Sequence, residues 1–225
     1  MTEPDGIEVI RYTRLVPYTE ALDIQLERWD AVVRGQAPDA LLLLEHPPVI
    51  TLGREARQTH LLADPQALRE AGVETVECDR GGDVTYHGPG QLVGYPIIDL
   101  RRYGLSIRSY IRALEAALIQ TLARHGVEGR REEGLTGVWH AKGKAAAIGV
   151  RVRRWTAYHG VALNVDPNMD HFKFIVPCGI QERPVTSLRE ILETPVSMDE
   201  IAAQFSHQFL SHFANLRADA VTGNA

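Results

Sequence analysis

Cysteine is scarce in this chain, which has only Cys78 and Cys178 among its 225 residues. Two cysteines cannot form the disulfide framework of a small secreted domain, which favours a reducing compartment. The chain also lacks a run of eighteen apolar residues, and its acidic start, residues 1–6, has no apolar stretch typical of a secretory signal. We therefore expect a cytoplasmic protein with one domain over residues 1–225 and frayed ends at 1–6 and 218–225.

An excess of positive charge is missing too, because 24 basic residues face 29 acidic ones and the net charge is −5. This balance argues against general binding of nucleic acids. Lysine is rare, and the three copies are Lys142, Lys144 and Lys173. Lys144 precedes a run of small and apolar residues, Ala145 to Gly149, which is an unusual setting for a solvated lysine. The alternative is an ordinary lysine at a strand end that reaches out to water.

Motifs for metals and nucleotides are also lacking. No Cys-x-x-Cys or His-x-x-x-His spacing occurs, and His207 and His212 do not share one helix face well. The glycines match neither a phosphate-binding loop nor a dinucleotide fingerprint. We therefore expect no metal ion and no resident cofactor.

The chain does have a dense glycine loop, Arg80-Gly-Gly-Asp-Val-Thr-Tyr-His-Gly-Pro-Gly-Gln91. Glycine permits backbone conformations and close approaches to a ligand that a Cβ would block, and Pro89 fixes one turn. Arg80, Tyr86 and His87 add a charge, a hydroxyl group and a titratable ring. This composition predicts a binding loop, and the alternative is a polar connection between two strands.

Apolar periodicity and turn residues place the remaining elements. Helices are predicted over 18–34, 65–71, 106–126 and about 198–214. Ser106 caps the third helix and Gly126 ends it, while Ser197 and Glu200 form a capping box at the start of the fourth.

Short apolar segments predict the strands. They lie at 7–12, 40–44, 49–52, 73–78, 92–98, 137–140, 144–152 and 156–165. Pro47 and Pro48 separate the second strand from the third, and Arg153-Arg154 turns the last two into a hairpin. Residues 166–180 are expected to form an irregular loop. The pattern predicts an α+β fold with a mixed, largely antiparallel sheet flanked by helices.

Cys178 is the main candidate for chemistry, because Pro177 before it and Gly179 after it place the thiol on a turn. A nucleophilic cysteine needs a cation or base that favours its thiolate. The candidates are Lys144, His46, His87 and His159; the histidines at 60, 125, 140, 171, 207 and 212 receive no role. A packing role for Cys178 is equally open at this point, and Cys78, at the end of an apolar strand, is interpreted as a packing residue.

Four segments together resemble the lipoyl(octanoyl) transferase family. They are the glycine loop, Lys144-Ala-Ala-Ala-Ile-Gly149, His159-Gly-Val-Ala-Leu-Asn164 and Pro177-Cys178-Gly179, in the family's order and spacing. The resemblance extends from about Tyr12 to Phe213. It implies the catalytic fold of biotin and lipoate protein ligases and the activity of an octanoyl-[acyl carrier protein]–protein N-octanoyltransferase.

The resemblance also implies roles for individual residues. Cys178 would be the nucleophile that carries the acyl group as a thioester, and Lys144 would lower the pKa of its thiol. The residues implied to line the substrate cleft are Arg80, Gly81, Gly82, Asp83, Val84, Thr85, Tyr86, His87, Ala147, Ile148, Gly149, Gly160, Val161 and Ala162. His46, His159 and Asn164 would support the site.

Small residues fit an acyl pocket on physical grounds. Residues 145–147, Gly149, Gly160 and Ala162 would leave a slot beside the backbone, with Ile148 and Val161 as apolar walls. At ~0.8 kcal/mol per buried CH₂, an eight-carbon chain would contribute about 5 kcal/mol to binding. Backbone amides of residues 176–179 would hold the oxyanion.

The implied partners are octanoyl-acyl carrier protein as donor and apo lipoyl domains as acceptors, in 2-oxoacid dehydrogenase E2 subunits and the glycine cleavage H protein. No ATP, nucleic acid or membrane is needed, and a monomer is expected. The candidates for docking an acidic carrier are Arg54, Arg57, Arg151, Arg153 and Arg154. The alternatives are an ATP-dependent lipoate or biotin ligase, a non-catalytic carrier-binding module and a cysteine peptidase.

Overall fold

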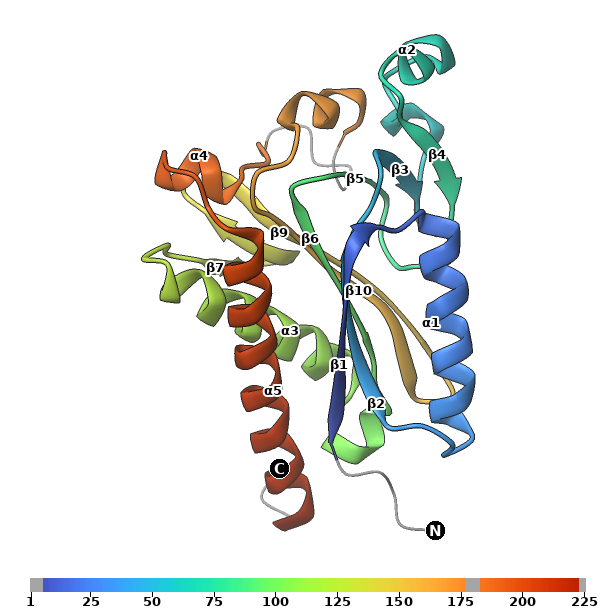
Figure 1. The fold of residues 1–225 in the computed structure, drawn as a ribbon, viewed down its shortest axis with the longest axis vertical. Helices are drawn as coiled ribbons and strands as arrows, with labels where there is room; N and C mark the ends of the chain where they lie inside the picture. The colour runs from blue at the N-terminus through green and yellow to red at the C-terminus, as the bar shows by residue number, and fades with distance from the viewer. Residues whose placement is uncertain (1–5, 177–182, 223–225) are drawn as a thin grey trace.

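The computed structural model describes residues 6–176 and 183–222, and a seven-stranded sheet forms its centre (Figure 1). The strands follow the order β1 (Ile7–Leu15), β2 (Asp39–Glu45), β6 (Gln91–Ile97), β10 (Thr156–Asn164), β9 (Gly143–Arg153), β8 (Leu135–His140) and β7 (Arg130–Glu132). Only β1 and β2 pair in parallel, and every other neighbouring pair in this sheet is antiparallel. The prediction of a mixed, largely antiparallel sheet with helices is confirmed.

Helices cover both faces of this sheet. Helix α1 (Tyr18–Val33) packs on one face, and α3 (Ile107–Arg124) and α5 (Met198–Thr222) pack on the other (Figure 1). Strand β2 shows why its sequence is continuously apolar. Leu42 and Leu44 pack with the residues of α1, while Leu41 and Leu43 pack with those of α3 and α5.

A second, three-stranded sheet holds part of the glycine loop. Its order is β4 (Glu74–Glu77), β3 (Val49–Leu52) and β5 (Val84–His87), and α2 (Pro65–Glu70) and the 3₁₀ helix η3 (Met169–Phe174) contribute to a small core beside it. The chain passes from β2 to β3 at the break predicted over residues 46–48. The sequence indicated one sheet, and it missed β5, because four residues inside a glycine-rich loop carry too short a pattern.

The helix ends follow the predicted caps. The Ser106 side chain accepts a hydrogen bond from Ser109 N, and Gly126 takes a positive φ of 72° after the C-terminus of α3. Helix α5 begins where Ser197 Oγ accepts a bond from Glu200 N. It continues beyond the predicted end at 214 to Thr222, into the tail expected to be frayed. Phe213 of α5 packs on the Tyr103 ring of η2 (Leu100–Tyr103), and this contact stabilises the C-terminal half of α5.

The apolar strand expected at 73–78 is largely exposed. Strand β4 is at the edge of the small sheet, and Cys78 after it is half-buried, with its thiol 3.4 Å from the carbonyl of Leu52. Besides β5, the elements that the sequence did not predict are short: β7, α4 (Leu188–Leu192) and the 3₁₀ helices η1 (Gln58–His60), η2 and η3, the last within the expected irregular loop. Among the helices of the described residues, none has the length and apolar character needed to cross a bilayer.

Candidate active site

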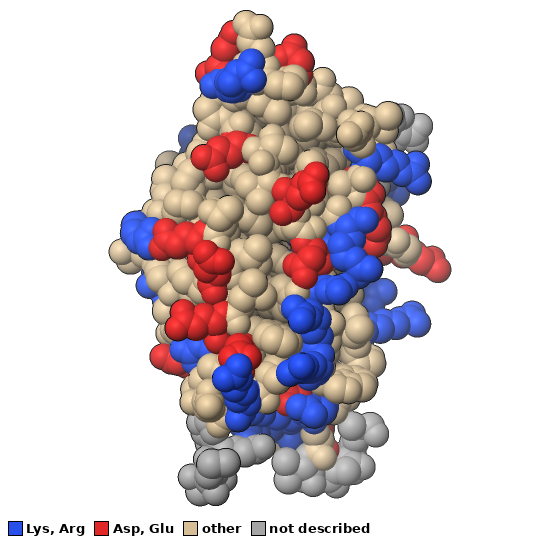
Figure 2. Space-filling model, turned by 90° about the vertical axis from the view of Figure 1, so that its right-hand side faces the viewer, with Lys and Arg blue, Asp and Glu red and all other residues tan. Residues whose placement is uncertain are grey.

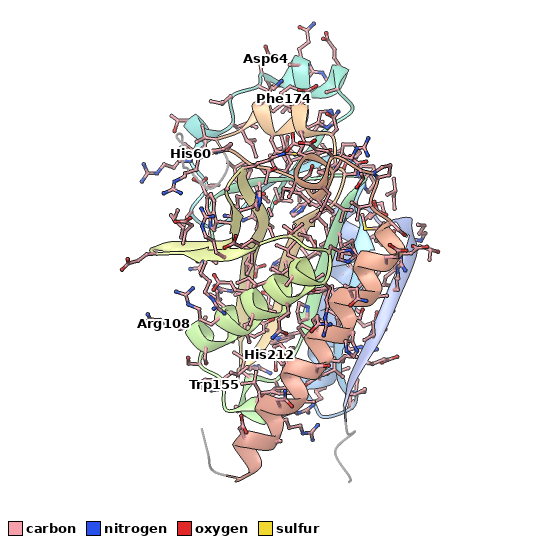
Figure 3. All side chains as sticks on the ribbon, turned by 90° about the vertical axis from the view of Figure 1, so that its left-hand side faces the viewer. His60, Asp64, Arg108, Trp155, Phe174 and His212 are labelled. Carbon is pink, nitrogen blue, oxygen red and sulfur yellow. The ribbon has the colours of Figure 1, made fainter. Side chains whose placement is uncertain are left out.

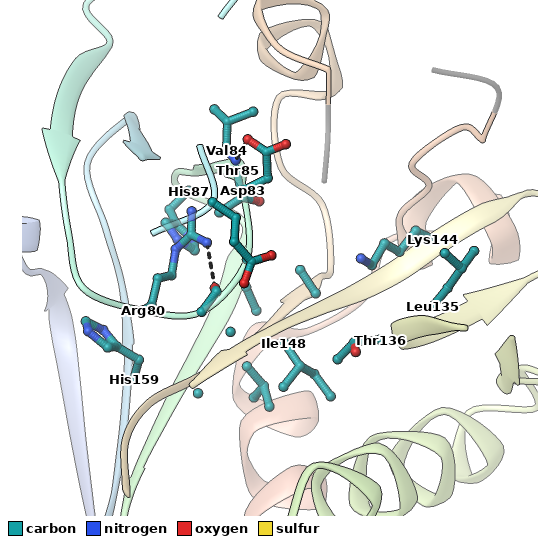
Figure 4. A pocket seen from close by; sticks show the side chains of 18 of the residues that line it. Arg80, Asp83, Val84, Thr85, His87, Leu135, Thr136, Lys144, Ile148 and His159 are labelled. Atoms are coloured by element: carbon teal, nitrogen blue, oxygen red, sulfur yellow. Dashed lines mark hydrogen bonds between the residues drawn. The ribbon is translucent and has the colours of Figure 1, made fainter. Parts of the chain in front are cut away.

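A cavity of about 500 Å³ lies where the glycine loop faces strands β9 and β10. Figure 4 shows Arg80 and His159 on one side of it and Lys144, Leu135 and Thr136 on the other. The described residues that line it are Tyr18, Glu55, Arg57, His60, Arg80–Val84, Thr85, His87, Tyr95, Gly134–Thr136, Lys144, Ala147–Gly149 and His159–Ala162. The volume is in the range of about 300–1,000 Å³ that is typical of small-molecule sites.

Seven of the eight predicted residues of the glycine loop line this cavity, and Tyr86 is the exception. Tyr86 is fully buried in the small core instead, with its hydroxyl 2.9 Å from Nδ1 of His171. Burial raises the pKa of this hydroxyl to about 12. Arg80 is held in the wall of the cavity by Thr51, because Nη2 donates to the carbonyl and the hydroxyl of Thr51 at 2.7 and 2.8 Å.

The small residues of β9 and β10 allow the loop to lie directly against the sheet. Gly149 pairs with Gly160, and a Cβ on Gly149 would lie 2.8 Å from the carbonyl oxygen of Gly81. The six predicted lining residues of these strands, Ala147–Gly149 and Gly160–Ala162, all face the cavity. Ala145 and Ala146 do not form part of the slot, since both are fully buried in the main core.

Lys144 is buried in the cavity wall with 6% of its surface exposed, and its ammonium lies 5.3 Å from the centre of the Trp139 ring. The Lys144 side chain passes over Gly137, where the absence of a Cβ leaves room for it. A Cβ there would lie 2.7 Å from Lys144 Cε and 2.5 Å from the carbonyl oxygen of Ala146. A solvated lysine at a strand end is therefore not the arrangement observed.

Cys178, with Pro177 and Gly179, lies outside the described residues, and so do most of the amides expected to hold an oxyanion. Both flanks of this segment are described. Before it, Val176 N donates to the carbonyl of His60 at 2.8 Å. After it, Lys144 N donates to the carbonyl of Pro184 at 2.8 Å, and Thr186 N donates to the carbonyl of Lys144 at 3.0 Å. Both flanks are thus bonded to residues that line the cavity.

Burial favours the neutral form of His46 and His87. His46 donates from Nδ1 to the carbonyl of Val16, and its Nε2 lies 2.7 Å from the Tyr95 hydroxyl. Burial lowers the pKa of His46 to about 4 and that of His87 well below its ordinary value. His46 lies behind the cavity wall, because its ring packs against Tyr18 and His87, which line the cavity.

His159 has an unusual backbone for a strand residue, with φ at +56°. Its backbone N–H donates to the Gln25 side chain at 2.8 Å, and its Nε2 donates to Asp79 at 2.9 Å. Desolvation lowers the pKa of His159, although Asp79 opposes that change. A non-glycine residue held in this region is strained, and such strain concentrates at functional sites.

Asn164 is connected to the cavity through hydrogen bonds with Gln91. Its Oδ1 accepts from Gln91 Nε2 at 2.8 Å, and Gln91 Oε1 in turn lies 2.7 Å from Nδ1 of His87. The amide group of Asn164 donates to the carbonyl of Thr186 at 3.0 Å. This chain of hydrogen bonds fixes the ring of His87 at the cavity.

Sequence reasoning missed His60, which lines the cavity and bonds through Nδ1 to a carboxylate oxygen of Asp83. It also missed Asp79 and His171. None of them belongs to a recognisable spacing pattern, since their partners are 23 to 85 residues away in the sequence.

The candidate docking arginines are in different environments. Arg57 lines the cavity, Arg151 lies 3.7 Å from Asp79, and Arg153 stacks at 4.9 Å over the Trp29 ring. Arg153 is nine residues from Lys144 along β9, or about 30 Å at ~3.3 Å per residue. Figure 2 shows Lys and Arg gathered in a column beside acidic residues on the α1 side. No group of three possible metal ligands occurs in the described part of the chain.

This fold is the catalytic fold of lipoate and biotin protein ligases. A bipartite lipoate protein ligase from Thermoplasma acidophilum has a TM-score of 0.68 at 16% identity, over 95% of this chain and 92% of that one. Lipoate-protein ligase A bound with ATP also has 0.68, at 15% identity, over 95% and 92%. A biotin protein ligase variant from Aquifex aeolicus has 0.56 at 11% identity, over 95% and 72%. These likenesses confirm the expected fold.

Sequence relatives are more specific. The lipoyl protein ligase A/B catalytic domain model matches residues 17–210. Octanoyltransferases from Solibacter usitatus and Koribacter versatilis are 48% and 47% identical. The first match covers 91% of this chain and 92% of the relative, and the second covers 86% and 79%. The chain belongs to the octanoyltransferase family within the lipoyl protein ligase A/B group, as the resemblance implied.

Proposed function

We propose that this protein transfers an octanoyl group from octanoyl-acyl carrier protein to a lysine of apo lipoyl domains, through a thioester on Cys178 and without ATP. Membership of the octanoyltransferase family supports acyl transfer in lipoylation. One observation carries the finer proposal. Lys144 is buried in the cavity wall, and its backbone is bonded to Pro184 and Thr186, six and eight residues beyond Cys178.

The first half of the reaction forms the acyl-enzyme. The Lys144 ammonium favours the thiolate of Cys178, which attacks the carbonyl carbon of the donor thioester. A new C–S bond forms, the bond to the phosphopantetheine sulfur breaks, and Lys144 gives that sulfur its proton. The exchange of one thioester for another is close to neutral in free energy.

The second half forms the amide. Neutral Lys144 takes one proton from the ammonium of the acceptor lysine, and the amine attacks the acyl carbon. A C–N bond forms, the Cys178 thiolate leaves, and the second proton goes to solvent. A thioester is replaced by an amide, so no ATP is needed. Ala147, Gly160 and Ala162 would lie along the acyl chain, and Ile148 and Val161 would form its apolar walls.

The test is the intact mass of the protein after incubation with octanoyl-acyl carrier protein alone. The wild type should gain one octanoyl group that hydroxylamine removes, and Cys178→Ser should gain none. Cys78→Ser is the matched control and should acylate like the wild type, because its half-buried thiol bonds to the carbonyl of Leu52. Addition of an apo lipoyl domain should discharge the adduct. Transfer that appears only with ATP and free octanoate would instead identify a ligase.

A further inference from the structure

Two histidines join the glycine loop to the segment that precedes Cys178. We infer that His60, held by Asp83, is a positioning residue that fixes residues 171–176 relative to the cavity. The contact between Tyr86 and His171 is a second link, or tie, between the loop and this segment. The functional part of this inference rests on the proposed acyl transfer. Neither histidine belongs to the four motifs that identify the family.

The first tie passes through His60. Its Nδ1 donates to Oδ2 of Asp83, and both side chains are largely buried, with 17% and 11% of their surfaces exposed. The other oxygen of Asp83 accepts from Val84 N at 2.8 Å and from Arg57 N at 3.3 Å. The carboxylate therefore bonds to three points of the cavity wall.

Backbone hydrogen bonds connect residues 60–62 to residues 174–176, the segment before Cys178. The His60 carbonyl accepts from Val176 N at 2.8 Å, and the Phe174 carbonyl accepts from Leu62 N at 2.8 Å. Leu61 and Ile175 form a β-bridge between these two contacts. Figure 3 shows His60 and Phe174 near each other at one end of the molecule, far from His212.

The second tie starts from Tyr86. Its hydroxyl lies 2.9 Å from Nδ1 of His171, and its ring packs edge-on against Phe172 at 5.2 Å. Strand β5 thus presents Thr85 and His87 to the cavity, while Tyr86 contacts η3. Two residues of one loop hold the same segment, so the position of the loop sets the position of residues 171–176. A misplacement of about 1 Å at a reacting group can cost on the order of 10²-fold in rate.

Hydrogen exchange at the Val176 amide tests the coupling without any acyl chemistry. In His60→Ala this amide should exchange at least about ten-fold faster than in the wild type, because the bond to the His60 carbonyl opens more often. His60→Asn should restore most of the protection, since the Asn amide can donate to Asp83 from nearly the position of Nδ1. His212→Ala is the control, a half-buried histidine on α5. An unchanged exchange rate in His60→Ala overturns the inference.

Single-turnover acylation tests the consequence. His60→Ala should form the octanoyl adduct about ten-fold more slowly than the wild type, and His60→Asn should recover to within about three-fold. In steady-state assays kcat/KM for the lipoyl domain should stay unchanged, because it depends only on the second half of the reaction. If the wild type forms no adduct, the proposed function fails, and the exchange result still decides the coupling. If the wild type acylates and His60→Ala acylates at the same rate, the positioning role is wrong.

Discussion

Asp79 accepts a hydrogen bond from Nε2 of His159 at 2.9 Å, and it directly precedes Arg80, the first residue of the glycine loop. The hydroxyl of Tyr158 donates to the other oxygen of this carboxylate. The bond from His159 is the main reason that the pKa of Asp79 falls to about 2, and the bond from Tyr158 adds to it. Asp79 is therefore ionised at neutral pH and anchors the ring of His159 through this hydrogen bond.

Replacement of Asp79 tests this anchor. Asp79→Ala should lower the rate of octanoyl transfer about ten-fold and destabilise the fold by about 1 kcal/mol, because His159 loses its acceptor and the carboxylate is half-exposed. Asp79→Asn should keep most of the transfer rate and most of the stability, since its carbonyl oxygen can still accept a hydrogen bond from His159 Nε2. The measurements are kcat, KM and urea unfolding for the three proteins. Equal kcat and stability in Asp79→Ala and the wild type would contradict the anchoring role.

Stability should fall in mild acid because His46 is buried in its neutral form. Its pKa is about 4 in the folded protein and about 6.5 when unfolded. Between these values the unfolded chain binds a proton that the folded chain does not, so stability is lost as the pH falls from about 6.5 to about 4. The shift corresponds to about 3 kcal/mol at most.

The variant His46→Asn isolates this contribution. Its amide can still donate to the carbonyl of Val16 in place of Nδ1, but it does not titrate. The difference in unfolding free energy between pH 7 and pH 4.5 should therefore be smaller in the variant by about 2 kcal/mol. His87 and His159 have lowered pKa values too, so a slope should remain. An unchanged slope in His46→Asn would show that His46 takes a proton in the folded state.

Much of this fold follows from local patterns, and the arrangement of the small sheet does not. Ser106 and Gly126 predicted the limits of α3 because capping depends on a few neighbouring residues. By contrast, the pairing of β3 with both β4 and β5 depends on contacts between distant segments. Periodicity in a strand of four residues does not specify its partner.

The candidate site shows the same division. The glycine loop and Lys144 were predictable because their composition is unusual within a few residues. The Asp83–His60 and Asp79–His159 pairs join residues 23 and 80 positions apart, and no local pattern marks them. The orientation of Tyr86 away from the cavity and into the small core also depends on β5 being a strand, where neighbouring side chains alternate.

Gly137 should be intolerant of a side chain because Lys144 passes beside it. Gly137→Ala would place a Cβ 2.7 Å from Lys144 Cε, at a φ of +119° that L-residues rarely adopt. We expect octanoyl transfer to fall by about 10²-fold as Lys144 is displaced. Unfolding free energy should fall by about 2 kcal/mol, from backbone strain and overpacking together.

Gly126→Ala is the matched control for that variant. Gly126 also has a positive φ, of 72°, but nothing lies within 4 Å of the added Cβ. It should lose about 1 kcal/mol of stability and keep wild-type transfer activity, since it is at the end of α3. Steady-state kinetics and urea unfolding of both variants make the comparison. Equal activity in the two would mean that Gly137 does not guide Lys144.

Thr51 should matter for the donor through Arg80, although Thr51 does not line the cavity. Its hydroxyl accepts from Arg80 Nε at 3.2 Å and from Nη2 at 2.8 Å, and it is fully buried on β3. Thr51→Val keeps the shape and removes this acceptor, so two N–H groups of a buried guanidinium lose a partner. We expect a loss of about 1–3 kcal/mol in stability, and a several-fold rise in the KM for the acyl donor as Arg80 moves in the cavity wall.

Thr75→Val, on exposed β4 of the same sheet, controls for the exchange of threonine for valine and should change neither stability nor KM. A rise in KM without any loss of stability would show that the Thr51 hydroxyl positions Arg80 but does not stabilise the fold. Wild-type values for both would contradict the prediction and show that the Thr51 carbonyl, 2.7 Å from Nη2, holds the guanidinium alone.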